Sequence, residues 1–144
     1  MSISGTWYNE LGSILTVSSI SGNAISGMYN TASGNASGNY PFVGRIDGGA
    51  PSGSASATGW TVVWSNSSGD SASATSWTGL YHPPNANTTE EIYTLWFLAN
   101  ELPEEADWYA IHAGQDTFTR TKPSPETVAK ARARGMAAHP TAKK

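Results

Sequence analysis

Hydrophobic and small polar residues alternate along most of this chain, and a period of two residues is typical of half-buried β-strands. The alternation is clearest where Trp60, Val62 and Trp64 share one face. Short segments rich in Gly, Pro, Asn and Ser separate the alternating runs, as expected for tight turns between strands. The pattern predicts eight strands, at residues 4–9, 14–19, 24–30, 40–46, 57–64, 72–81, 90–99 and 108–119.

Eight strands joined in chain order by short connections predict an all-β fold, an up-and-down antiparallel β-barrel with meander topology. Gly22-Asn23 is a signal for one of its hairpin turns. Closure into a barrel would remove the exposed edges that an open sheet presents. We expect the barrel domain to cover residues 1–122, followed by a C-terminal tail at 123–144.

The tail carries the signals of a short helix over residues 125–134. Ser124 can cap its start, Pro125 suits the first helical position and Gly135 can end it. Isolated helices of this length are marginal in water, so an unstructured tail is the favoured expectation and the short helix is the alternative.

The composition excludes several classes of partner. Only 13% of the residues are charged and the net charge is −3, which gives no basic footprint for nucleic acid. No apolar run approaches the roughly 20 residues that span a bilayer, so we expect no membrane partner. Cysteine is absent, which excludes disulfides and Cys-ligated metals. Strand-like sequence begins at Ile3 with no visible signal peptide, so the expected location is either the cytoplasm or, if a leader has been removed, a secreted compartment.

Tryptophan is the most informative residue type. A Trp side chain buries a large rigid surface but keeps one N–H that needs a partner. Two of the six, Trp7 and Trp60, are expected mainly to pack the core. The other four occupy positions that can line one cavity, and they are Trp64, Trp77, Trp96 and Trp108. Together they suggest a closed barrel around a compact, partly apolar ligand.

Five segments, in order, resemble the avidin and streptavidin family. They are residues 5–13 (GTWYNELGS), 59–64 (GWTVVW), 73–79 (SATSWTG), 94–98 (TLWFL) and 114–119 (GQDTFT). The loop at 29–36 (YNTASGNA) is similar to the lid region of streptavidin. The likeness covers about residues 3–123, which is nearly the whole chain.

The resemblance implies a barrel that binds biotin at one open end, with no cofactor and no catalysis, and by analogy a role in sequestering this vitamin. It implies that Asn9, Ser13 and Tyr29 donate to the ureido oxygen of biotin. Asp116 and Thr31 would each accept one ureido N–H.

The same resemblance implies how the rest of the ligand is held. Thr75 would face the thioether sulfur, while Ser73 and the backbone N–H of Asn35 would meet the valerate carboxylate. Ser33 stands in the lid where streptavidin has an apolar residue, so we expect faster release of biotin than from streptavidin. The walls around the bicyclic ring and alkyl chain would be formed by Trp64, Trp77, Trp96 and Leu98.

Assembly is a further expectation. Trp108 resembles the residue that this family inserts into a neighbouring subunit's site, which favours a homotetramer. Ala113 and Gln115 depart from the family at positions of subunit contact, so a homodimer is the alternative.

Other interpretations of the same residues stay open. Asn9 and Ser13 flank a turn, where such side chains commonly bond the local backbone, and Asp116 could pair with Arg120 or Lys122. The whole chain could be a lipocalin-like carrier of a lipophilic ligand or a carbohydrate-binding β-domain. An enzyme is the least favoured class, because its histidines form no recognisable nucleophile–base pattern and no metal-ligand spacing occurs. The histidines are His82, His112 and His139.

Overall fold

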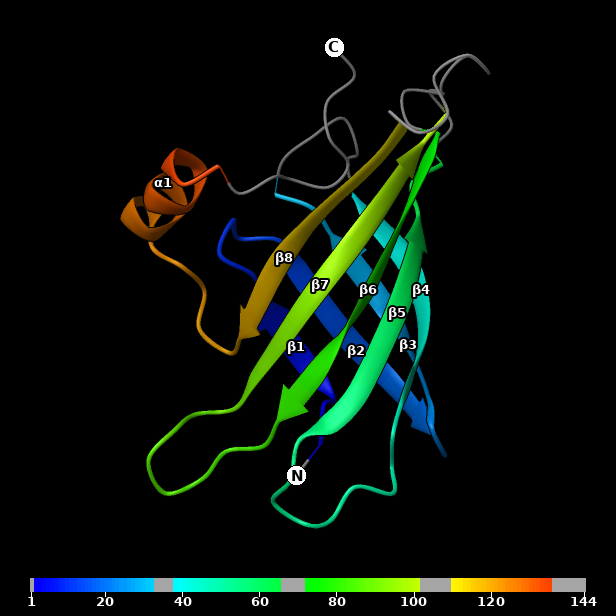
Figure 1. The fold of residues 1–144 in the computed structure, drawn as a ribbon, viewed down its shortest axis with the longest axis vertical. Helices are drawn as coiled ribbons and strands as arrows, with labels where there is room; N and C mark the ends of the chain where they lie inside the picture. Colours follow the sequence, from blue (N-terminus) through cyan, green and yellow to red (C-terminus); the bar gives the residue numbers. More distant parts are fainter. Residues whose placement is uncertain (1, 33–37, 66–71, 102–109, 136–144) are drawn as a thin grey trace.

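The computed structural model describes residues 2–32, 38–65, 72–101 and 110–135. Its eight strands form a closed barrel in which each pairs antiparallel with the next in chain order (Figure 1). The all-β meander is therefore confirmed. The strands are β1 (Gly5–Tyr8), β2 (Ile14–Ser21), β3 (Ala24–Asn30), β4 (Asn39–Ile46), β5 (Ser56–Val63), β6 (Ser73–His82), β7 (Glu91–Asn100) and β8 (Ile111–Thr119).

Strand boundaries differ from the predicted ones by a few residues. Asn9 falls outside β1, because it enters the turn before β2. Trp64 lies just after β5, although its backbone N–H still donates to the carbonyl of Ser73 at 2.8 Å. The last strand begins at Ile111 rather than at residue 108, and Trp108 lies outside the described residues.

Alternation along each strand separates the core from the outer surface. In β7, Thr94, Trp96 and Leu98 are buried, whereas Leu95 and Phe97 between them are each 62% exposed. Large rings from several strands fill the interior. Trp60 stacks on Trp77 with 5.7 Å between ring centroids, so the expectation that Trp60 serves packing agrees with its place in the core.

The barrel closes where β1 meets β8, and this junction is short. Tyr8 and Thr119 are the residue pair that joins the two strands. The guanidinium of Arg120 lies 3.6 Å from the ring centroid of Trp7 and donates to the carbonyl of Thr6 at 3.1 Å. Its Nε also donates to the carboxylate of Glu90 at 2.6 Å. One side chain thus links the segments on both sides of the junction.

The C-terminal helix α1 (Pro125–Ala133) lies outside the barrel (Figure 1). The Ser124 hydroxyl accepts the N–H of Thr127 at 3.2 Å, and Gly135 follows the helix with φ +81°. The helical alternative for the tail is therefore confirmed, and the favoured expectation of an unstructured tail is wrong for residues 125–133. Ala131 is buried and Val128 lies near Gly12 in the turn before β2, so tertiary contacts support a helix too short to be stable alone. Within the described residues, no helix has the length and apolar character needed to cross a membrane.

Arg120→Ala should lower the free energy of unfolding by about 1–3 kcal/mol, because it removes a cation–π contact and charge-assisted bonds across the junction. Arg120→Lys should recover only part of the loss, since an ammonium lacks the planar fork of the guanidinium. Urea unfolding measures both, with the exposed Arg45→Ala as the matched control. Equal stability of Arg120→Ala and Arg45→Ala would contradict the role of Arg120 in closure.

Candidate functional site

Most of the predicted site residues gather inside one end of the barrel. Asn9 follows β1 and Ser13 precedes β2, so both come from the same turn, while Tyr29 lies near the end of β3. All three side chains are buried, with Tyr29 fully so. The antiparallel order brings the ends of β1, β3, β5 and β7 together with the starts of the strands that follow them.

The Asn9 side chain has a defined orientation. Its Oδ1 accepts the backbone N–H of Ser13 at 2.9 Å and that of Leu11 at 3.1 Å. Because the oxygen is used by the turn, the Nδ2 group points inward and approaches the Tyr29 hydroxyl at 3.5 Å. The local role of Asn9 in the turn is therefore confirmed, and its Nδ2 group remains directed at the interior.

Burial keeps the Tyr29 hydroxyl protonated. Desolvation raises the pKa of Tyr29 well above 10.0, the nearby negative charge of Asp116 raises it further, and a hydrogen bond with Ser13 opposes the shift. The Ser13 hydroxyl also accepts the backbone N–H of Ala32 at 3.2 Å. The turn and the end of β3 thus form one connected group of neutral donors.

Asp116 on β8 contributes a buried carboxylate. Its Oδ2 accepts the indole N–H of Trp77 at 2.9 Å, and its backbone carbonyl accepts the Thr94 hydroxyl at 2.9 Å. The proposed pairing of Asp116 with Arg120 is wrong, because Arg120 reaches Glu90 and the β1 backbone instead.

Glu10 brings a second carboxylate near this group. It accepts the backbone N–H of Thr117 at 2.9 Å. Burial raises the pKa of Glu10, and the charge of Asp116 adds to the shift while the backbone hydrogen bonds oppose it. Sequence reasoning did not select Glu10.

Aromatic rings wall the donor group. The Tyr29 ring centroid lies 5.0 Å from that of Trp77 and 5.6 Å from that of Trp64. The indole N–H of Trp64 donates to the hydroxyl of Thr75 at 2.8 Å. The register adds Trp96 opposite Trp77 and Leu98 opposite Thr75 on the same buried face.

Other predicted residues differ in how far the structure describes them. Thr31 is buried just after β3, and Ser73 is half-buried at the start of β6. The lid residues Ser33 and Asn35, and the predicted intersubunit Trp108, lie outside the described residues.

Besides Glu10, two further contributors to this region were not assigned to the site from the sequence. The Tyr40 ring packs edge-on against Trp64, with centroids 5.2 Å apart. Thr94 bonds the Asp116 backbone. Alternation was the available signal for both, since each occupies an inward position on its strand.

Helix α1 reaches the turn that carries the donors. A Cβ placed on Gly12, whose φ is +85°, would lie in ordinary van der Waals contact with the tail, at 3.9 Å from the Pro123 Cγ and 4.0 Å from the Val128 Cγ2. The tail therefore lies against the 9–13 turn. The sequence alone did not indicate this contact.

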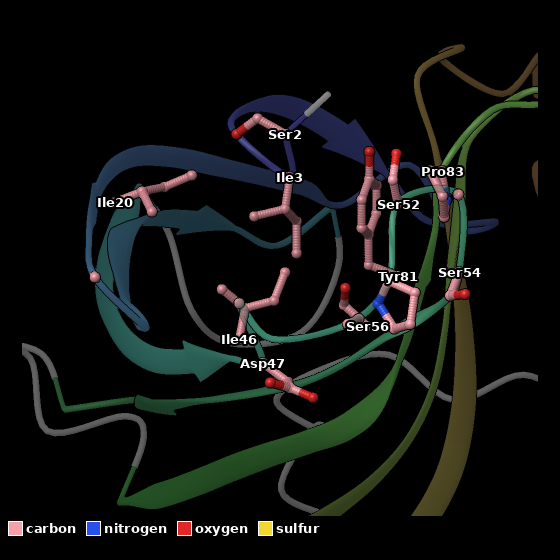
Figure 2. A pocket seen from close by; sticks show the side chains of 15 residues that line it. Ser2, Ile3, Ile20, Ile46, Asp47, Ser52, Ser54, Ser56, Tyr81 and Pro83 are labelled. Atoms are coloured by element: carbon pink, nitrogen blue, oxygen red, sulfur yellow. The ribbon is translucent and has the colours of Figure 1, made fainter.

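The opposite end of the barrel holds a separate hollow of about 310 Å³ (Figure 2). Ile3, Ile46 and Tyr81 supply apolar surface, and Asp47 lies at its edge. Of the predicted ligand residues that the structure describes, none lines this hollow.

Comparison with known families agrees with this architecture. The model of the avidin family matches residues 1–121. The chain belongs to the avidin family. The match covers all eight strands and ends before α1, so the resemblance recognised from five sequence segments is confirmed.

The donor group, Asp116 and the aromatic walls all lie within the part of the chain matched to the avidin family. Among the residues that the structure describes, no three His, Cys, Asp or Glu side chains are grouped as metal ligands. The region combines neutral donors, a buried carboxylate and apolar rings, which is a composition suited to a small ligand with a polar head.

Tyr29 should make the stability of this avidin-family chain fall at high pH. The folded state keeps the Tyr29 proton above pH 10.0, whereas the unfolded state releases it near its ordinary pKa. The contribution of Tyr29 to stability is therefore fully present below the pKa of the unfolded state, and it is lost as the pH rises through the pKa of the folded state. Tyr29→Phe should make this decline shallower in urea unfolding at roughly pH 8 to 11.

The matched control is Trp64→Phe, which alters a ring against Tyr29 but removes no titrating group. It should lower stability at every pH and keep the slope of the unmodified chain. An unchanged slope in Tyr29→Phe would contradict the assignment.

Proposed function

We propose that this avidin-family chain binds biotin in one site per barrel and catalyses no reaction on it. The observation that carries the proposal is the convergence of three buried neutral donor side chains, Asn9, Ser13 and Tyr29, within the electrostatic influence of Asp116. A urea group has one acceptor oxygen and two N–H donors in a plane, so it complements such a group.

The proposed chemistry is a polarisation of the ureido ring. Three donors on the oxygen would favour an oxyanion-like form, and acceptance of an N–H by a carboxylate would favour the same shift of charge. Asp116 and Thr31 would accept the two N–H groups. Surrounding rings would exclude water and so strengthen each hydrogen bond. Biotin–streptavidin is among the tightest noncovalent complexes known, so very tight binding is the expected class.

The remainder of biotin would follow the walls toward the barrel mouth. Trp64, Trp77, Trp96 and Leu98 would enclose the bicyclic ring and the alkyl chain, and Thr75 would face the sulfur. The half-buried Ser73 at the start of β6 and the backbone of Asn35 would meet the carboxylate. Ser33 would leave the lid less apolar, with faster release than from streptavidin as the result.

Titration of ligand-free protein with biotin, followed by calorimetry and tryptophan fluorescence, tests the proposal. Saturation near one biotin per chain would support it. Absence of binding would overturn it, and retinol and a saccharide, tested on the same sample, would then distinguish a lipophile carrier from a sugar-binding barrel.

We also propose that the barrels assemble as a homotetramer, with a homodimer as the alternative. Support comes from an exposed apolar strip on the outer face of β7, formed by Tyr93, Leu95 and Phe97. Ala113 and Gln115 flank this strip, since they pair with Phe97 and Leu95. Exposed apolar patches commonly mark protein interfaces. Sedimentation of the unmodified chain measures the assembly, and a single barrel would overturn both versions.

Asp116→Ala should weaken biotin binding by about 3 kcal/mol, roughly a hundredfold in Kd, because a buried N–H of the ligand and that of Trp77 would lose their acceptor. Competition calorimetry measures the change. Asp47→Ala, which removes an exposed carboxylate at the far end, should bind as the unmodified chain does. Equal affinity of the two variants would contradict the proposed role of Asp116.

Trp108→Ala should weaken biotin binding by about tenfold or more, because the proposed site would lose an apolar surface supplied by a neighbouring subunit, while each barrel stays folded. Biotin release rates measure the loss, and circular dichroism checks the fold. Unchanged release in an assembled protein would count against a shared site.

A further inference from the structure

Trp96 lies between two very different neighbours across the sheet. Its partner on β6 is Trp77, and its partner on β8 is Gly114. Trp77 and Trp96 are both buried at 1% exposure. The Trp77 indole occupies the space over β6, whereas Gly114 has no side chain. Space for the Trp96 ring is therefore found only over β8.

The Trp96 ring uses this space completely. A Cβ added to Gly114 would lie 2.3 Å from Cζ2, 2.6 Å from Cε2 and 2.9 Å from Cη2 of Trp96. Favourable contacts between carbon atoms are about 3.5–4.0 Å. The six-membered part of the indole therefore lies directly on the Gly114 backbone, in the volume that any side chain would need.

The neighbours of Trp96 leave a displaced ring one direction to move. Thr94 and Leu98 are buried on either side of it along β7. Trp77 is held by its bond to Asp116 at 2.9 Å and by stacking on Trp60. A ring pushed away from β8 must therefore move into the barrel.

We propose that Gly114 is a positioning residue for the ligand site. By leaving its volume to the Trp96 indole, it holds that wall flat against β8 and sets the width of the site two residues from Asp116. This inference rests on the proposed function, since the ligand whose space is protected is biotin. Any side chain at position 114 would move the wall into that space.

Gly114→Ala should therefore release biotin about tenfold faster or more, because overpacking a well-filled interior is costly. Trp96→Phe removes Cζ2 and Cη2, two of the three colliding atoms. In a Trp96→Phe background, adding Gly114→Ala should change the release rate much less. Gly49→Ala, in the exposed connection at the far end, is the matched glycine control and should leave release unchanged. Similar release from Gly114→Ala and the unmodified chain, or an equal effect in both backgrounds, would overturn the inference.

Melting temperatures of the ligand-free proteins separate this inference from the proposed function. The loss caused by Gly114→Ala should be smaller in the Trp96→Phe background, whether or not biotin binds. Failure of the unmodified chain to bind biotin would refute the proposed function. The difference between the two melting-temperature losses would still test whether the Trp96 ring lies on Gly114. If Gly114→Ala does not fold, folding of the double variant supports the placement, and its failure to fold overturns it.

Discussion

Contact between the first and last strands is the constraint on which this barrel depends, because without it the sheet has two open edges. The paired stretch is short, since β1 has four residues and joins β8 through the pair of Tyr8 and Thr119. Arg120 reinforces it through the Trp7 ring, the β1 backbone and Glu90. The candidate site depends on the same junction. Asn9 follows β1 and Asp116 lies on β8, so the two halves of the polar group meet only when the barrel is closed.

The polar groups of the site are held in place by the protein itself. The turn backbone orients Asn9, and the Trp77 indole and Thr94 hydroxyl both bond to Asp116. Groups that are already oriented lose little freedom when a ligand arrives. The surrounding rings lower the local dielectric and strengthen each bond. The same low dielectric keeps the Tyr29 hydroxyl protonated, as the rise in its pKa indicates. Burial therefore strengthens the hydrogen bonds of the site and also preserves Tyr29 as a donor.

Large rings require small residues beside them, because protein interiors are closely packed. The Trp96 indole occupies the space on the inner face of β8 that a side chain at Gly114 would need. Gly12 has a different role, since its φ of +85° suits the donor turn, which the tail contacts through Pro123 and Val128. The Trp96 wall thus lies on β8, and α1 lies beside the donor turn.

The sequence by itself determined the eight strands, their inward faces and the start of α1, since alternation and helix capping are local properties of the chain. It also identified the family, through five ordered segments. Only the tertiary structure decided which side chains meet. Asn9 contacts Tyr29 across 20 positions, and Trp77 reaches Asp116 across 39. Such pairings depend on strand register and barrel closure, which no local pattern encodes. For that reason only the fold decided that Asp116 pairs with Trp77 and where α1 lies.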